Sequence, residues 1–308
     1  MRSGRSAVSQ VGVAVQFGLL ALAWGSSFLF IKIGLDGLSP VQVVAARMVF
    51  GALLLGLVML VTRSRIPRDG SLWGHLTVVS LLLCVLPFTL FAWAEQEISS
   101  GLASIYNATT PLTTMAFATV LLSSERLTRD RGTGLGFGFA GVLVIVGPWS
   151  LGSGGGGLLP QLACLAATTS YGLAFVHLRR FVTGRGIPAV TVAFIQVTTG
   201  AVILGLATSL AADTPVHLTS SVVLSMVALG AVGTGLAYVW NTNVVAAWGA
   251  ANASAVTYLT PVVGVVLGIL VLREPLTWNQ PVGAALVIAG ILAAHGRFRR
   301  SPSRSQRV

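Results

Sequence analysis

The chain has 308 residues, of which 54% are hydrophobic and 9% charged, and its formal net charge is +11. Soluble domains carry about a quarter charged residues, so this composition excludes a soluble globular protein. Apolar stretches recur along the whole chain, and about 20 such residues are enough to cross a bilayer core of roughly 30 Å as a helix.

Ten apolar stretches follow one another with short connections between them. Their approximate bounds are 11–34, 40–62, 72–95, 100–123, 131–149, 157–178, 188–211, 219–246, 250–272 and 279–296. The first stretch is longer than the apolar part of a signal peptide, which has about 7–15 residues, so we count it as a helix. The sequence therefore predicts an all-α integral membrane protein with ten transmembrane helices.

The basic residues concentrate on one side of the membrane that ten spans define. Of the 19 Lys and Arg residues, 16 lie in the two terminal segments and in the loops after the second, fourth and sixth stretches. The positive-inside rule makes that side cytoplasmic, so we expect a multi-pass protein of the inner (plasma) membrane with both termini in the cytoplasm. The Arg-rich C-terminal tail suits anionic lipid headgroups, and no folded module beside it indicates a nucleic-acid partner.

The second five stretches repeat the first five at a distance of about 149 residues. The features that recur in register are a proline, a Glu-containing turn and a glycine: Pro111 and Pro261, Ser124–Thr128 and Arg273–Thr277, and Gly141 and Gly290. A unit of five spans enters the membrane from the side opposite to its copy, which gives the inverted repeat that recurs in secondary transporters. The predicted units are an N-terminal tail at 1–10, repeats at 11–149 and 158–296, a Gly-rich linker at 150–157 and a basic tail at 297–308.

The fifth stretch is rich in glycine, with Gly132, Gly134, Gly136, Gly138 and Gly141. Glycines at a spacing of four residues allow helix backbones to approach closely. We expect this helix to pack against a neighbouring helix or, in a homodimer, against a second copy of the chain.

Three charged side chains fall within or at the end of predicted spans of the first repeat, namely Lys32, Arg47 and Glu95. A charge at the bilayer centre costs about 2.5–3.5 kcal/mol, so such residues are functional candidates. Arg47 lies roughly 10 Å below the outer surface, where it either pairs with a substrate carboxylate or Glu95, or snorkels outward or joins two helices. Glu95 is the first choice for a proton-coupled carboxylate, and Lys32 is an interface anchor.

Glu125 and Glu274 occupy equivalent positions in the two repeats, at opposite faces of the membrane. Each stands a few residues before an apolar stretch. We expect each carboxylate to cap the helix that follows it, since acidic side chains satisfy the N–H groups of a first helical turn. A gating role is the alternative.

Pro111 and Pro261 each remove a backbone hydrogen bond within an apolar helix. Interrupted helices at corresponding positions of two halves point to a binding site near the membrane midplane. We predict that both prolines are hinges and that nearby polar and aromatic side chains line a substrate cavity; alternatively, the polar groups only satisfy the freed carbonyls. The cavity candidates are Trp24, Ser27, Arg47, Trp93, Glu95, Tyr106, Asn107, Thr110, Tyr171, Trp240, Asn241, Thr257 and Tyr258.

Several motifs resemble those of the EamA family of the drug/metabolite transporter superfamily, over residues 15–296. They are Trp24–Phe28 with Lys32, Pro40, Ala46-Arg47, Ala103–Pro111 and Glu125–Leu127 in the first copy, and Tyr171-Gly172, Ala255–Pro261 and Glu274–Leu276 in the second. The resemblance implies ten helices in two inverted repeats around a central cavity, and export of small metabolites by alternating access. Gln196 stands opposite Arg47 in the second copy, so a site based on charge would be asymmetric.

The combined interpretation is a secondary active transporter that exports small metabolites, such as amino acids or related amphipathic compounds. Its partners are a small-molecule substrate and the lipid bilayer, with coupling either to protons or to the gradient of the substrate itself. No nucleotide-binding motif, His-Glu-x-x-His or Gly-x-Ser-x-Gly motif occurs, so we expect no cofactor, no metal and no catalytic residue. A channel and a non-transporting scaffold or receptor stay as alternatives, and an intramembrane enzyme is the least favoured.

Overall fold

The computed structural model describes residues 10–122, 128–147, 157–210, 215–248 and 256–294. Within these ranges every regular element is a helix. The following parts of the sequence interpretation lie outside the described residues: most of the N-terminal tail, Glu125, residues 150–156 of the linker and the basic C-terminal tail.

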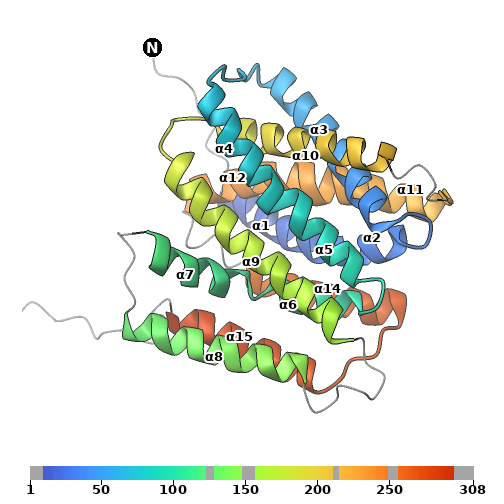
Figure 1. The fold of residues 1–308 in the computed structure, drawn as a ribbon, viewed down its shortest axis with the longest axis vertical. Helices are drawn as coiled ribbons and strands as arrows, with labels where there is room; N and C mark the ends of the chain where they lie inside the picture. Colours follow the sequence, from blue (N-terminus) through green and yellow to red (C-terminus); the bar gives the residue numbers. More distant parts are fainter. Residues whose placement is uncertain (1–9, 123–127, 148–156, 211–214, 249–255, 295–308) are drawn as a thin grey trace, which may run out of the picture.

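The α-helices carry the labels used in Figure 1, and η is used for the π-helical segments. Those of the first half are α1 (Gln10–Gly25), α2 (Ser27–Gly34), α3 (Pro40–Val61), α4 (Gly70–Ser80), η1 (Leu81–Val85), α5 (Leu86–Ala94), α6 (Ser100–Asn107), α7 (Thr110–Leu121) and α8 (Arg129–Val146). Those of the second half are α9 (Leu158–Phe181), α10 (Ala189–Leu210), α11 (Ser220–Val227), η3 (Ala228–Leu236), α12 (Ala237–Trp248), α14 (Val256–Leu272) and α15 (Asn279–Ala294).

Helices occur in all ten predicted stretches. In the described part, six are long and apolar enough to cross a membrane: Val11–Gly34, Pro40–Val61, Gly70–Ala94, Leu158–Phe181, Ala189–Ser209 and Ser220–Trp248. Val256–Leu272 and Asn279–Ala293 are shorter apolar helices. The chain is therefore an all-helical, multi-pass membrane protein, and the count of ten crossings stays a prediction.

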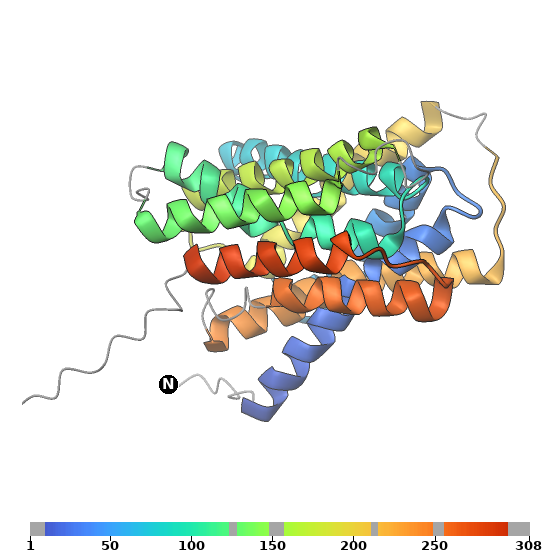
Figure 2. The ribbon, with the colours of Figure 1, turned by 90° about the horizontal axis from the view of Figure 1, so that it is seen from below.

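The two halves of the chain share one interior. Figure 2 shows most helices running side by side, with α1 tilted away from the others toward the N-terminus. Helix α3 packs against α10 and η3, and α5 and α7 pack against α9. The largest core cluster accordingly joins Val43 and Met48 of the first half to Val197 and Leu229 of the second. The largest buried cluster thus lies between the halves.

The two π-helical segments, η1 and η3, occupy corresponding places in the two repeats. Each lies beside a glycine of the other half. A Cβ atom at Gly51 of α3 would lie 3.0 Å from Thr234 of η3, and one at Gly200 of α10 would lie 3.2 Å from Oγ of Ser80, which precedes η1. Since π-helical turns often accompany functional sites, this crossing region is where a site is expected.

Helices α8 and α15 form a close antiparallel pair at one edge of the bundle (Figure 1). A Cβ atom at Gly141 would lie 2.8 Å from the backbone oxygen of Gly283, and one at Gly290 would lie 2.6 Å from that of Gly134. These four positions are related by the sequence repeat, so the contact is symmetric. Gly134, Gly138 and Gly141 of α8 therefore pack against neighbouring helices, whereas nothing lies within 4 Å of the Cβ positions of Gly132 and Gly136. A homodimer stays a prediction.

Candidate functional site

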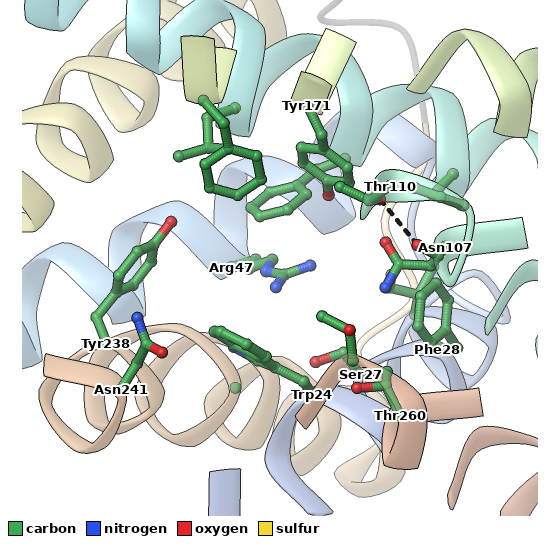
Figure 3. A pocket seen from close by; sticks show the side chains of 17 residues that line it. Trp24, Ser27, Phe28, Arg47, Asn107, Thr110, Tyr171, Tyr238, Asn241 and Thr260 are labelled. Atoms are coloured by element: carbon green, nitrogen blue, oxygen red, sulfur yellow. Dashed lines mark hydrogen bonds between the residues drawn. The ribbon is translucent and has the colours of Figure 1, made fainter. Parts of the chain in front are cut away.

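A pocket with a volume of about 190 Å³ lies inside the bundle (Figure 3). Its walls come from both halves: α1, α2, α3, η1, α5, α6 and α7 from the first, and α9, η3, α12 and α14 from the second. Because both halves contribute, any movement of one half against the other changes the shape of the pocket.

Eight of the predicted cavity residues line this pocket, and they come from eight different helices. They are Trp24, Ser27, Arg47, Asn107, Thr110, Tyr171, Asn241 and Thr257. Figure 3 shows the Arg47 guanidinium extending into the middle, with Tyr171 on one side and Trp24 on the opposite side. Whether these residues bind a substrate stays a prediction.

Five predicted cavity residues lie elsewhere. Tyr106 is fully buried and donates a hydrogen bond to Gln161 Oε1 at 2.5 Å. Trp240 packs against the cluster around Leu20, while Trp93 and Tyr258 pack against the cluster around Phe91. Glu95, the fifth, follows the last residue of α5 and is not among the residues that line the pocket. Trp93 and Tyr258 belong to α5 and α14, which are apolar on nearly all faces, so the sequence does not indicate which face turns toward the pocket.

Nine residues of the pocket wall are absent from the predicted set, and five of them are aromatic. The nine are Phe28, Ile31, Leu83, Phe88, Phe91, Phe175, Gly233, Tyr238 and Thr260. A signal for some of them existed, because residues three or four positions apart share one face of a helix. Phe28 follows Trp24 by four positions, Phe175 follows Tyr171 by four, and Tyr238 precedes Asn241 by three.

Arg47 is the cation of the pocket and is only 7% exposed. Its Nε donates a hydrogen bond to Thr234 Oγ1 at 2.9 Å, and its Cζ lies 3.7 Å from the centroid of the Phe88 ring. Within the described part of the chain it forms no salt bridge. The arginine thus joins two helices, as one of the predicted alternatives required, while its charge has no acidic partner in the described part of the chain.

Glu95 does not pair with Arg47 or Lys32. Its side chain is fully buried, and neither carboxylate oxygen has a hydrogen-bond partner among the described residues. Lys32 instead donates to the backbone oxygens of Glu95 and Ile98, the latter at 3.0 Å. Lys32 therefore links α2 to the turn after α5, and its predicted role as an interface anchor stays a prediction.

The two prolines sit in different local structures. Helix α6 ends at Asn107, and Pro111 lies in the first turn of α7, where proline costs no hydrogen bond. Pro261 lies inside α14, which continues on both sides of it. The first helix is therefore interrupted and the second is not, and the role of both prolines as hinges stays a prediction.

Each proline-containing helix packs against a glycine that follows a pocket aromatic. A Cβ atom at Gly25, next to Trp24, would lie 2.9 Å from the backbone oxygen of Thr260. One at Gly172, next to Tyr171, would lie 2.8 Å from Thr113. A change of angle at either proline would therefore displace an aromatic wall of the pocket.

Glu274 binds the N-terminus of α6, not that of the helix following it, which corrects the expectation from sequence. Its Oε1 accepts a hydrogen bond from Ser100 N at 2.8 Å, and its Oε2 accepts from Ser100 Oγ at 2.9 Å and Gly101 N at 3.1 Å. A carboxylate there satisfies unpaired N–H groups and the helix dipole. Because Glu274 belongs to the second half, this contact ties the halves together at the predicted outer end.

The arrangement of two like halves agrees with a family comparison. The model of the EamA-like transporter family matches residues 13–147 and, a second time, residues 158–294. The chain belongs to this family. The two matches establish the two-repeat pattern, while the finer bounds of the predicted units stay predictions.

The EamA-like chain also resembles named membrane proteins over most of its length. It is 26% identical to the uncharacterized transporter YoaV of Bacillus subtilis, covering 94% of this chain and 99% of that protein. It is 27% identical to a probable amino-acid metabolite efflux pump of Salmonella typhimurium, covering 89% and 91%. A solved crystal structure that is 20% identical matches 95% of this chain and 100% of that one with a TM-score of 0.67, which shows the fold alone.

Proposed function

We propose that the protein is a secondary active transporter of the inner membrane that exports small metabolites by alternating access. The observation that carries this proposal is that one pocket takes its walls from both repeats. Rocking of one half against the other then opens the pocket to each side of the membrane in turn. Pro111 and Pro261 are the hinges, and both termini lie in the cytoplasm.

The substrate is a small amphipathic molecule. The pocket combines aromatic and aliphatic walls with a few hydroxyl, amide and guanidinium groups, the composition typical of small-molecule sites. The relatives named as amino-acid metabolite efflux pumps support amino acids or related compounds as the substrate class.

Glu95 couples transport to protons in this proposal. A buried carboxylate without hydrogen-bond donors is costly when charged, and hydration of Glu95 during the movement of the halves removes that cost. The carboxyl group then binds a proton in one state and releases it in the other. Lys32 donates to the backbone oxygen of Glu95, so a shift of this ammonium group changes the proton affinity of the carboxylate.

Efflux from proteoliposomes tests the transport function. Vesicles loaded with a pooled metabolite extract are followed by mass spectrometry, with and without a pH gradient. We expect selective, saturable loss of a few compounds, accelerated by the gradient. Absence of selective loss would contradict transport and favour a scaffold or receptor, and conductance far above carrier turnover would favour a channel.

A matched pair of variants tests the pathway. Thr257 and Val262 lie on the same helix, but Thr257 lines the pocket and Val262 is 55% exposed on the outer surface of the bundle. Thr257→Trp should fill the pocket and abolish efflux, whereas Val262→Trp should leave it unchanged. Equal efflux by both variants would exclude this pocket as the pathway.

A further inference from the structure

The charge balance of the pocket indicates the charge of its ligand. Arg47 is the one cationic residue among those lining it, and the described lining contains no acidic side chain. A buried guanidinium without a counter-ion is unfavourable, because its desolvation is not compensated. A ligand that brings a negative charge removes that cost, and a ligand that brings a positive charge adds to it.

The geometry of Arg47 leaves one side of its guanidinium for a ligand. Nε is occupied by Thr234, and the Phe88 ring covers one face of the guanidinium plane. The two terminal amino groups make no hydrogen bond to the described part of the protein, and Figure 3 shows them directed into the middle of the pocket. Two parallel N–H donors in one plane match the two oxygens of a carboxylate.

The remaining walls suit an uncharged body. Trp24, Phe91 and Tyr171 offer aromatic surface, and Asn107 and Asn241 offer neutral amides. An ammonium group would find no carboxylate on the described lining and would be repelled by Arg47. We propose that the pocket binds small carboxylate anions that lack a free ammonium group and carry an aromatic or branched apolar body, such as N-acylated, 2-oxo or 2-hydroxy acids. This substrate class deepens the proposed function and rests on it for transport.

Probes that share one scaffold and differ in charge test the proposal. They are N-acetyl-L-phenylalanine as the anion, L-phenylalanine as the zwitterion and L-phenylalanine amide as the cation, together with the three corresponding leucine compounds. Binding to the purified full-length protein in detergent is measured by calorimetry. We expect the anions to bind at least about tenfold more tightly than the zwitterions and cations, as charge-assisted hydrogen bonds allow.

Variants assign the effect to Arg47. Arg47→Gln keeps a donor for Thr234 but removes the charge, and it should weaken anion binding by about 10- to 100-fold. Arg47→Lys should restore part of the affinity, because it restores the charge without the paired donors. Arg180→Gln is the matched control, since Arg180 also lies over a phenylalanine ring, that of Phe181, but is exposed and outside the pocket. Unchanged melting temperatures exclude misfolding as the cause.

Each outcome decides the question. Tighter binding of zwitterions or cations, anion binding that survives Arg47→Gln, or no binding of either anion overturns the proposed substrate class. Counterflow of the same compounds in proteoliposomes separates this result from the transport function. An anion that binds but is not carried contradicts transport alone, whereas a zwitterion that is carried independently of Arg47 contradicts the substrate class alone.

Discussion

The two halves of the molecule share a scaffold but not a set of charges. The glycines of α8 and α15 and the π-helical segments recur in both halves, in equivalent contacts. Lys32, Arg47 and Glu95 occur in the first half only, and the residues about 149 positions later are Phe181, Gln196 and Val244. A symmetric scaffold supports movement in both directions, whereas a single set of charges defines one binding and coupling site.

The largest expected effect is on the symmetric scaffold. Gly141→Ala should destabilise the protein by about 3 kcal/mol, the upper part of the usual range for overpacking, because the added Cβ meets backbone atoms of α15 at 2.8 Å. Gly290→Ala should cost about the same if the halves are equivalent. Gly136→Ala is the control on the same helix, since nothing lies within 4 Å of its Cβ position. Melting in detergent checks all three, and equal stability of the Gly141 and Gly136 variants would contradict the close contact.

The next effect concerns the contacts that join the halves at opposite ends. Glu274 accepts three hydrogen bonds at α6, while Arg185 pairs with Asp69 at 2.9 Å through side chains that are 33% and 53% exposed. Glu274→Ala should weaken the contact between the halves at the predicted outer end by about 2 kcal/mol, because hydrogen bonds to charged groups contribute about that much. Arg185→Ala should weaken the contact at the opposite end by less than about 1 kcal/mol, because exposed ion pairs contribute little. A cysteine is introduced at Thr110 in each variant, and the rate at which a membrane-impermeant maleimide labels it measures how far the pocket is open to solution. A larger effect of Arg185→Ala would reverse this ranking of the two ends.

A smaller effect is expected at Glu95, whose carboxylate has no counterpart in the second half. Glu95→Gln mimics the protonated carboxyl permanently, so the acceleration by a pH gradient, at most about tenfold per pH unit for one proton, should disappear. Exchange of substrate without a gradient should persist, because Glu95 does not line the pocket. The matched control is Glu97→Gln, since Glu97 is exposed two residues further on. Acceleration that survives in the Glu95 variant would exclude this residue as the coupling site.

Features that follow from the spacing of the two repeats could be predicted from the sequence. Features that depend on the rotation of a helix, or on contacts between distant segments, could not. The spacing alone identifies Gly141 and Gly290, and the small size of glycine predicts their close helix contacts. The chemistry of Tyr106 and Trp93 suits a pocket, yet their side chains pack in the core. The sequence position of Glu274 predicts a contact with the nearest helix, yet its hydrogen bonds go to Ser100, 174 positions away. A contact between helix ends from different halves leaves no pattern in the local sequence of either one.

The smallest expected effect separates the two prolines. Pro261→Ala restores an N–H inside the continuous helix α14 and should stabilise it by about 1 kcal/mol, the worth of one hydrogen bond. Pro111→Ala should change stability by less, because an N–H group in the first turn of α7 has no carbonyl acceptor within that helix. If flexing at Pro261 moves Gly25 and the adjoining Trp24, the stabilised variant should also transport more slowly, and the Pro111 variant should not. Melting temperature and efflux rate, measured on both variants, check this. Equal slowing by both would restore the symmetric pair of hinges that the sequence predicts, and slowing by neither would place the movement elsewhere between the halves.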